Sequence, residues 1–196
     1  TNPNYVTKTC EYTLAVTKRS VTVAIAGHTS TTEYNGAAHT VTGYDITSIS
    51  NALYTSSDFT FSGSASASRT DTGTTNMGLA ASQFTNNNAN FEVTFNVTDG
   101  YQTITPKPLT ITAASDSIIY DGTALTNDDY TNTPLASGDV ITSITITGSQ
   151  TVAGTSNNVP SAAVIKDGTE DVTSNYNITY TNGTLTVTPR PVTLTS

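Results

Sequence analysis

The sequence predicts an all-β protein made of two tandem β-sandwich repeats in an elongated arrangement, and three observations carry this prediction. Threonine, a β-branched residue that favours strands, occurs 43 times in 196 residues. No window of about a dozen residues has the apolar spacing of an amphipathic helix with caps at its ends. Several short phrases recur at a nearly constant spacing, which is typical of repeat proteins.

The balance of charges excludes two classes of protein. The chain has 7 Lys and Arg against 15 Asp and Glu, a net charge of -8. A nucleic-acid partner is not expected, because neutralising phosphates requires clustered cations. The sequence contains no run of about 18 apolar residues, so we expect no membrane insertion within this fragment. The single cysteine, Cys10, cannot form an internal disulfide, so packing alone must hold the fold.

One phrase marks the repeat most clearly. Asn4-Tyr5, Asn90-Phe91 and Asn175-Tyr176 each open a similar stretch, and their asparagines lie 86 and 85 positions apart. Two further landmarks keep roughly this spacing. They are Tyr34-Asn35-Gly36 with Tyr120-Asp121-Gly122, and Thr72-Gly73 with Ala153-Gly154. An aromatic residue followed by Asn-Gly or Asp-Gly predicts a turn between strands, with the tyrosine buried. The sequence therefore predicts one structural unit that occurs more than once along the chain.

The period divides the chain into four parts. We interpret residues 1–19 as the last hairpin of a preceding repeat, 20–106 as the first repeat, 107–190 as the second, and 191–196 as the start of a following repeat. The boundaries carry Pro106 and Pro108, and then Pro189 and Pro191. Because proline fixes φ and extends the preceding residue, these linkers are expected to be stiff. The boundary at 17–20 lacks prolines and is expected to bend more easily.

Alternation of apolar residues with threonine predicts the strands. The leading strands carry Val21, Val23 and Ile25 in the first repeat, and Leu109 and Ile111 in the second. Central strands are expected at residues 59–61 and 140–146. Such a density of strands, in units of about 85 residues, favours a two-layer sandwich of immunoglobulin-like size. A β-grasp-like variation stays open, because residues 47–51 and 80–84 could each contain one helical turn.

The end of each repeat is predicted to be a β-hairpin. In the second repeat, Tyr176, Ile178 and Tyr180 alternate with polar residues, and Leu185 and Val187 follow in the same manner. Asn182-Gly183 lies between them, a pair that favours a tight turn. The matching turns are expected at Asp99-Gly100 and, in the leading fragment, around Cys10-Glu11.

Several of these phrases together resemble a known class of repeat. They are residues 104–112, Tyr120-Asp121-Gly122, residues 175–178 and residues 183–190. They resemble the MBG and YDG-type repeats, bacterial immunoglobulin-like modules that occur in tandem in large surface and secreted proteins. The resemblance covers nearly the whole chain and is more specific in the second repeat. It implies a bacterial adhesin-like protein that is extracellular, cell wall-associated or secreted, and it implies no reaction.

The sequence does not predict an enzyme. It has no GxSxG, no HExxH and no phosphate-binding glycine-rich loop, so we expect no catalytic residues and no cofactor. His28 and His39 are too few for a zinc site, which needs three or four ligands. The carboxylates of residues 167–171 lack the EF-hand pattern, so a solvated loop is preferred to a calcium site. A cross-link from Lys107 to Asn175 or Asn177 fits the expected topology, although a solvated lysine is the preferred interpretation.

Two functions follow from this organisation. The first is a non-catalytic stalk or spacer in adhesion. Threonine-rich strands and stiff linkers suit this function, and its partners are the adjacent repeats of the same chain. The alternative is an adhesin module that binds carbohydrate or protein, so that host glycans or proteins are its partners. Exposed aromatic rings would then stack on sugars. The candidate rings are those of Tyr44, Tyr54, Tyr101 and Tyr130.

Overall fold

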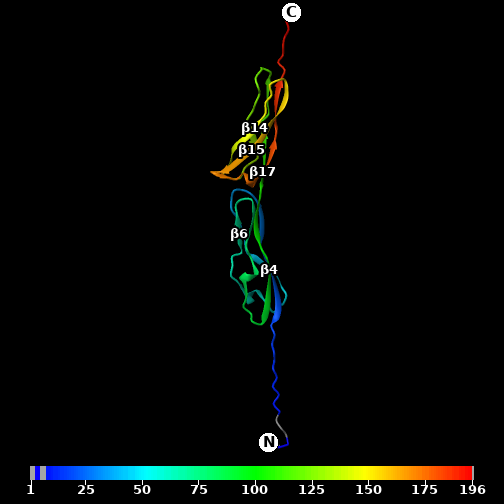
Figure 1. Ribbon diagram of the computed structural model, residues 1–196, viewed down its shortest axis with the longest axis vertical. Helices are drawn as coiled ribbons and strands as arrows, with labels where there is room; N and C mark the ends of the chain where they lie inside the picture. Colours follow the sequence, from blue (N-terminus) through cyan, green and yellow to red (C-terminus); the bar gives the residue numbers. More distant parts are fainter. Residues whose placement is uncertain (1–2, 5–7, 196) are drawn as a thin grey trace.

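The computed structural model describes residues 3–4 and 8–195, and its regular structure is almost entirely strand. Eighteen strands and three short 3-10 helices occur in the described part of the chain, which contains no α-helix. The all-β prediction is therefore confirmed. In Figure 1, the strands of residues 19–105 (here the N-terminal region) and those of residues 107–188 (the C-terminal region) follow one another along the long axis of the view.

The N-terminal region contains ten strands and two 3-10 helices. They are β1 (Arg19–Gly27), β2 (Thr29–Glu33), β3 (His39–Thr42), β4 (Tyr44–Ile49), η1 (Ser56–Asp58), β5 (Phe59–Phe61), β6 (Ser66–Arg69), β7 (Gly73–Asn76), η2 (Ala81–Gln83), β8 (Phe84–Asn86), β9 (Phe91–Thr98) and β10 (Tyr101–Thr105). They form two three-stranded sheets, β4-β1-β9 and β2-β10-β7, and the strand pairs β3-β6 and β5-β8.

The C-terminal region contains eight strands and one 3-10 helix. They are β11 (Lys107–Ala113), β12 (Asp116–Ile119), β13 (Tyr130–Asn132), β14 (Asp139–Thr147), β15 (Gly154–Asp167), β16 (Glu170–Asp171), η3 (Thr173–Asn175), β17 (Tyr176–Thr181) and β18 (Gly183–Thr188). One sheet has the order β13-β11-β17, and the other has the order β12-β18-β15-β14. The strands expected from alternation at both leading positions, at 59–61 and at 140–146 are present.

The first and last strands of each region pair in parallel. β1 pairs with β9 and then β2 with β10, while β11 pairs with β17 and then β12 with β18. In the N-terminal region, Arg19 N donates to Asn90 O at the start of β1 and β9. Tyr34 N donates to Thr105 O at the end of β2 and β10. The chain therefore leaves the region at the end opposite to its entry.

The predicted terminal hairpins are wrong for this reason. β17 and β18 do not pair with each other, because β17 joins β11 and β18 joins β12 and β15. Gly183 has no positive φ and is instead pressed against another backbone, where a Cβ would lie 2.1 Å from Ala114 O. The glycine thus lets two backbones cross as the chain passes from one sheet to the next.

The N-terminal region has the same crossing. A Cβ on Gly100 would lie 2.3 Å from His28 O, and one on Gly27 would lie 2.4 Å from Gly100 N. The Asp99-Gly100 turn prediction fails in the same way, since β9 and β10 belong to different sheets. For the leading hairpin, residues 8–18 form no strand, and residues 5–7 lie outside the described residues.

One of the two expected helical turns is present. Residues 81–83 form η2, and the Gln83 side chain accepts a hydrogen bond from Ala80 N at 2.9 Å. The other segment is strand, because residues 47–49 belong to β4, which pairs with β1. The β-grasp-like variation gains no support from either segment.

Two main hydrophobic clusters form the core. The first lies within the N-terminal region and includes Val21, Val23 and Ile25 of β1, packed with a group of aromatic rings. The second contains Leu109 and Ile111 of β11 together with residues of β15 and β17, and it also contains Tyr34 and Ile104 from the N-terminal region. This second cluster therefore crosses the boundary between the regions.

The crossing glycine predicts a large effect of a single methyl group. In Gly183→Ala, the new Cβ meets the backbone at residues 113–114, so the strands must separate, and we expect a loss of roughly 3 kcal/mol in the free energy of unfolding. Urea unfolding followed by circular dichroism measures this. Gly168→Ala is the matched control, because its Cβ has open space and only its φ of +57° opposes alanine, which costs about 1 kcal/mol. Equal losses in the two variants would contradict the crossing.

Candidate functional site

The residues singled out for metal chemistry do not come together. His28 Nδ1 lies 2.7 Å from Thr42 O, and its Nε2 lies 3.3 Å from an oxygen of Asp45. These two contacts raise the pKa of His28, the carbonyl of Thr42 having the larger effect. His39 Nε2 lies 2.9 Å from the side-chain oxygen of Asn35. In the described ranges, no three His, Cys, Asp or Glu residues are grouped so that they could hold a metal ion.

The acidic segment at 167–171 is a turn. It connects β15 to β16, with Asp167 opposite Glu170. Asp171 accepts a hydrogen bond from Thr173 N at 3.0 Å, and the side chain and backbone of Thr173 lower the pKa of this carboxyl group. The carboxylate of Asp171 therefore stabilises the local turn.

Lys107 is engaged by a carboxylate. Its Nζ lies 3.2 Å from Glu33 Oε1, while the side chain of Asn175 is committed to other partners. A cross-link between Lys107 and Asn175 is therefore not arranged in this structure.

The four tyrosines proposed to stack on sugars do not share a surface. Tyr54 is buried against Phe59 and Phe91. Tyr44 packs on other rings of the first cluster, and Tyr130 packs against the second cluster. Only Tyr101 is exposed, at 38 %. Most of these rings are therefore core residues.

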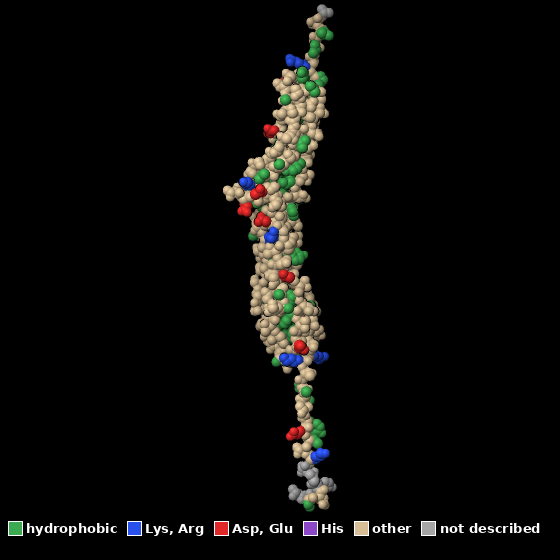
Figure 2. Space-filling model, viewed as in Figure 1, with side chains coloured by type: hydrophobic (Ala, Val, Ile, Leu, Met, Phe, Trp, Pro, Cys, Tyr) green, Lys and Arg blue, Asp and Glu red, His purple; other side chains and the backbone are tan. Residues whose placement is uncertain are grey.

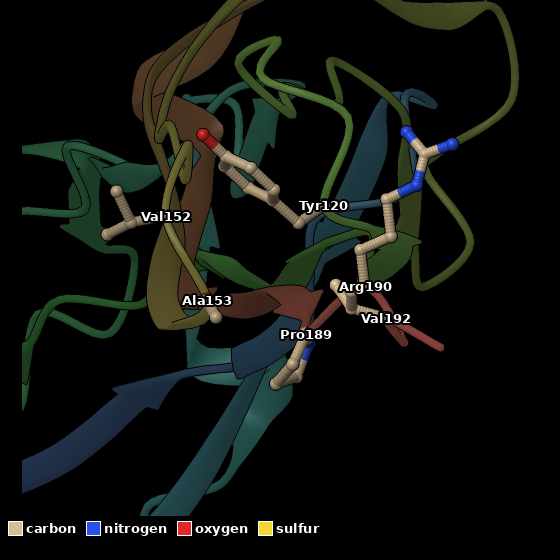
Figure 3. Close-up of a pocket in the computed structure, with 6 residues that line it drawn as sticks. All are labelled: Tyr120, Val152, Ala153, Pro189, Arg190 and Val192. Atoms are coloured by element: carbon tan, nitrogen blue, oxygen red, sulfur yellow. The ribbon is translucent and has the colours of Figure 1, made fainter. Parts of the chain in front are cut away.

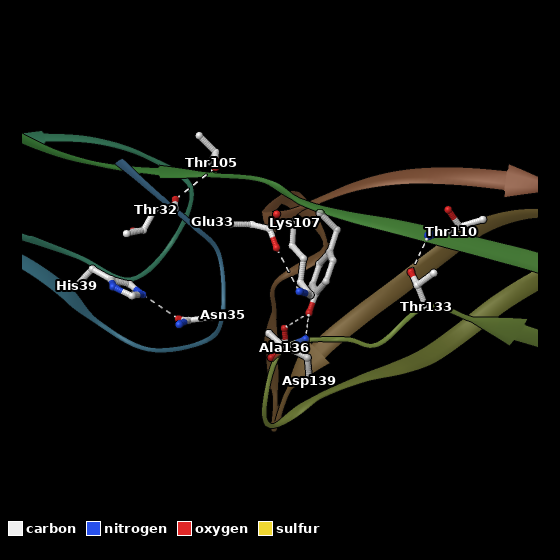
Figure 4. Close-up of polar contacts among 11 residues, drawn as sticks. Thr32, Glu33, Asn35, His39, Thr105, Lys107, Thr110, Thr133, Ala136 and Asp139 are labelled. Atoms are coloured by element: carbon white, nitrogen blue, oxygen red, sulfur yellow. Dashed lines mark hydrogen bonds and ion pairs between the residues drawn. The ribbon is translucent and has the colours of Figure 1, made fainter. Parts of the chain in front are cut away.

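The side-chain hydrogen bonds that join the most distant positions in the sequence lie at the junction between the two regions. Only Pro106 separates β10 from β11. On the N-terminal side of this proline, Thr105 Oγ1 donates to Thr32 O at 3.3 Å, and on its other side Lys107 contacts Glu33 (Figure 4). Both linker residues are thus tied back to β2, which limits rotation at the proline.

Tyr34 enters the core of the other region. Its side chain is 2 % exposed, and its ring meets that of Tyr176 edge to face, with 5.6 Å between ring centroids. Burial raises the pKa of Tyr34 most, the charges of Asp139 and Asp71 raise it further, and a contact with Asn175 opposes them. An aromatic pair of this kind stabilises by about 1 kcal/mol beyond the area it buries.

Tyr176 is itself fixed by two hydrogen bonds. Its hydroxyl donates to Asp139 Oδ2 at 2.5 Å and accepts from Ala136 N at 2.9 Å (Figure 4). Burial raises the pKa of Tyr176 strongly, and the bond to Asp139 raises it further. The Tyr176 ring, which Tyr34 contacts, is therefore fixed by hydrogen bonds at its hydroxyl.

Asn175 forms the polar part of the junction. It is 2 % exposed, and its Oδ1 accepts from Thr72 N at 2.9 Å and from Thr72 Oγ1 at 3.1 Å. Its Nδ2 donates to Asp71 Oδ1 at 2.8 Å. A buried amide that binds Thr72 and Asp71, 103 and 104 positions away, specifies one orientation of the two regions. The sequence marked residues 72 and 175 only as parts of repeated phrases, so this contact was missed.

The two Tyr-Asx-Gly tripeptides have the same backbone but different surroundings. Asn35 Oδ1 accepts from Ala37 N at 3.0 Å, and Asp121 Oδ1 accepts from Thr123 N at 2.8 Å. The predicted turns are therefore confirmed at both positions. Burial of the tyrosine holds for Tyr34 but is wrong for Tyr120, which is 41 % exposed.

Each end of the described strands has a groove. The groove beside Tyr120 has a volume of about 480 Å³ and is lined by Tyr120, Val152, Ala153, Pro189, Arg190 and Val192 (Figure 3). The groove at the start of β1 has about 400 Å³ and is lined by Val16, Thr17, Lys18, Arg19, Ala89, Asn90 and Phe91. On the face seen in Figure 2, charged side chains are scattered and most of the surface is neutral and polar.

No family model, curated protein or solved structure matches the chain. Within residues 3–4 and 8–195, no helix has the length and apolar character needed to cross a membrane.

The junction predicts a selective effect of one amide. Asn175→Ala leaves Thr72 N–H and Asp71 without their partner, so we expect a loss of about 2 kcal/mol in the free energy of unfolding of the C-terminal region. Asn177→Ala is the matched control, since Asn177 is exposed on the neighbouring strand. Chemical unfolding followed by circular dichroism compares them. If both variants are as stable as the parent chain, the amide does not hold the junction.

Proposed function

We propose that the protein is a non-catalytic spacer in which two copies of one sandwich-type repeat are joined end to end into a stiff rod. The observation that carries this proposal is the junction, where Tyr34 and Asn175 connect two regions already joined through a single proline. A flexible tether between binding modules would not need a buried contact at this point.

The strand order supports a repeated unit. In both regions the first and last strands are parallel and cross at a glycine. In both, the chain enters at one end of the region and leaves at the other. Units of this kind extend a chain along one axis when they are joined in series. The described residues before β1 and those after β18 lie at opposite ends of the molecule in Figure 1, as a spacer requires.

The surface is also suited to a spacer. Threonine hydroxyls keep the outward faces of strands hydrated without charge, and a net charge of -8 opposes association between neighbouring copies. We propose further that these units are MBG or YDG-type repeats of a bacterial extracellular adhesin-like protein, on the strength of the phrases at residues 104–112, 120–122, 175–178 and 183–190.

Small-angle X-ray scattering of the chain in solution tests the proposal. We expect the distance distribution of a rod, with an early maximum and a long, smooth tail, at both low and high salt. Tyr34→Ala removes the ring from the junction, so its distribution should lose the longest distances as the two regions bend toward each other. A compact particle, with the regions folded side by side, would overturn the spacer.

A further inference from the structure

We propose that the surface formed by Tyr120, Val152 and Ala153, here called the end surface, binds a further repeat in the same way as the surface around Tyr34 binds the C-terminal region. Its occupant is the entry end of a further repeat of the same kind, attached after Pro189. This inference rests on the proposed function, because it extends the joint of the rod to a second position.

The sequence places equivalent residues at the two positions. Tyr120 corresponds to Tyr34, and Ala153 corresponds to Thr72, whose backbone N–H donates to Asn175. The turn that presents each tyrosine also has the same form, with φ values of +82° at Gly36 and +89° at Gly122. The backbone at the end surface is therefore already shaped as it is at the junction.

The two positions differ in what covers them. Tyr34 is 2 % exposed because the C-terminal region packs on it, whereas Tyr120 is 41 % exposed. Val152 is exposed as well, and it lines the same groove as Tyr120 and Ala153 (Figure 3). Exposed apolar groups that gather in one place commonly mark a contact surface.

The chain also carries the complementary half. At the junction this half is Asn175 and Tyr176, and their counterparts Asn90 and Phe91 line the groove at the start of β1. Asn175 is buried by its partners, whereas Asn90 is exposed. Each region thus has a tyrosine-bearing exit end and an Asn-aromatic entry end. Such a head-to-tail contact continues in one direction instead of closing on itself.

The linker matches as well. Thr105-Pro106-Lys107-Pro108 at the junction corresponds to Thr188-Pro189-Arg190-Pro191 at the end surface. Lys107 contacts Glu33, and Arg190 lines a groove together with Tyr120 and Asp121. A cation that follows the proline therefore lies near a carboxylate beside the tyrosine at both positions.

The contact at the end surface is expected to be more apolar than the junction. Ala153 keeps the backbone N–H but lacks the hydroxyl of Thr72, and Val152 stands where Asp71 accepts from the Asn175 amide. Only one of the three hydrogen bonds of Asn175 is therefore retained. The side chain of Val152 supplies apolar area in their place.

A lengthened chain tests the proposal. A second copy of residues 107–196 is placed after Pro189, so that the new boundary again has the order Thr-Pro-Lys-Pro. The sequence contains no tryptophan, so Tyr120→Trp in the first copy gives a single fluorescent reporter. We expect its acrylamide quenching constant to be at least about threefold lower than in the 196-residue chain with the same substitution, since a covered side chain is removed from solvent.

Tyr101→Trp is the matched control, because Tyr101 is exposed at 38 % on β10, away from the end surface. Its quenching should be the same in both chains. Equal quenching of the reporter at 120 in the two chains would overturn the docking proposal, and so would shielding that is lost on dilution, because the cover would then be another molecule. The scattering test uses the 196-residue chain without an added repeat, so its result for the spacer does not depend on whether the end surface binds a further repeat.

A second measurement uses no substitution at the end surface. The lengthened chain has two residues equivalent to Tyr120, one at the new boundary and one at the end, and tetranitromethane modifies exposed tyrosines. We expect about half of the peptide that carries this tyrosine to stay unmodified, because one copy is buried as Tyr34 is. Complete modification, under conditions in which Tyr101 reacts fully, would contradict the proposal.

Discussion

The insertion of Tyr34 into the core of the C-terminal region is the interaction on which the rest of the structure depends. The ring packs against Tyr176, which is held by Asp139, and beside it Asn175 binds the backbone and side chain of Thr72. The apolar and polar parts of this contact require the same orientation of the two regions. Only one proline separates β10 from β11, so the hydrophobic cluster that joins the two regions lies beside the covalent link between them.

A topological constraint explains why the contact forms at that position. In each region, the first and last strands are parallel, and they change sheets together where a glycine lets their backbones cross. A terminal hairpin would return the chain to the end at which it entered. The parallel arrangement instead carries the chain to the opposite end, where the tyrosine-bearing turn lies. The rod proposed here thus follows from Gly100 and Gly183 as much as from any linker.

Much of the fold could be predicted from the sequence, because alternation and turn chemistry are local. The strands that carry Val21 and Leu109 and the turns at Asn35 and Asp121 were predicted in this way. The predicted pairing of β17 with β18 is wrong, because an Asn-Gly pair suits a tight turn and a backbone crossing equally well, and alternation does not determine which strand a given strand pairs with. The contact of Thr72 with Asn175 was missed because it joins residues 103 positions apart, and nothing local distinguishes a buried amide from one in a turn.

The junction is proposed to hold the two regions in one orientation. Pulsed electron resonance between nitroxide labels tests it most directly, with Thr60→Cys and Thr145→Cys as the exposed label positions on either side and Cys10→Ser to remove the native thiol. We expect a single narrow distance distribution that broadens when Tyr34→Ala is added. A distribution that is already broad in the chain with Tyr34 intact, and unchanged by the substitution, would contradict it.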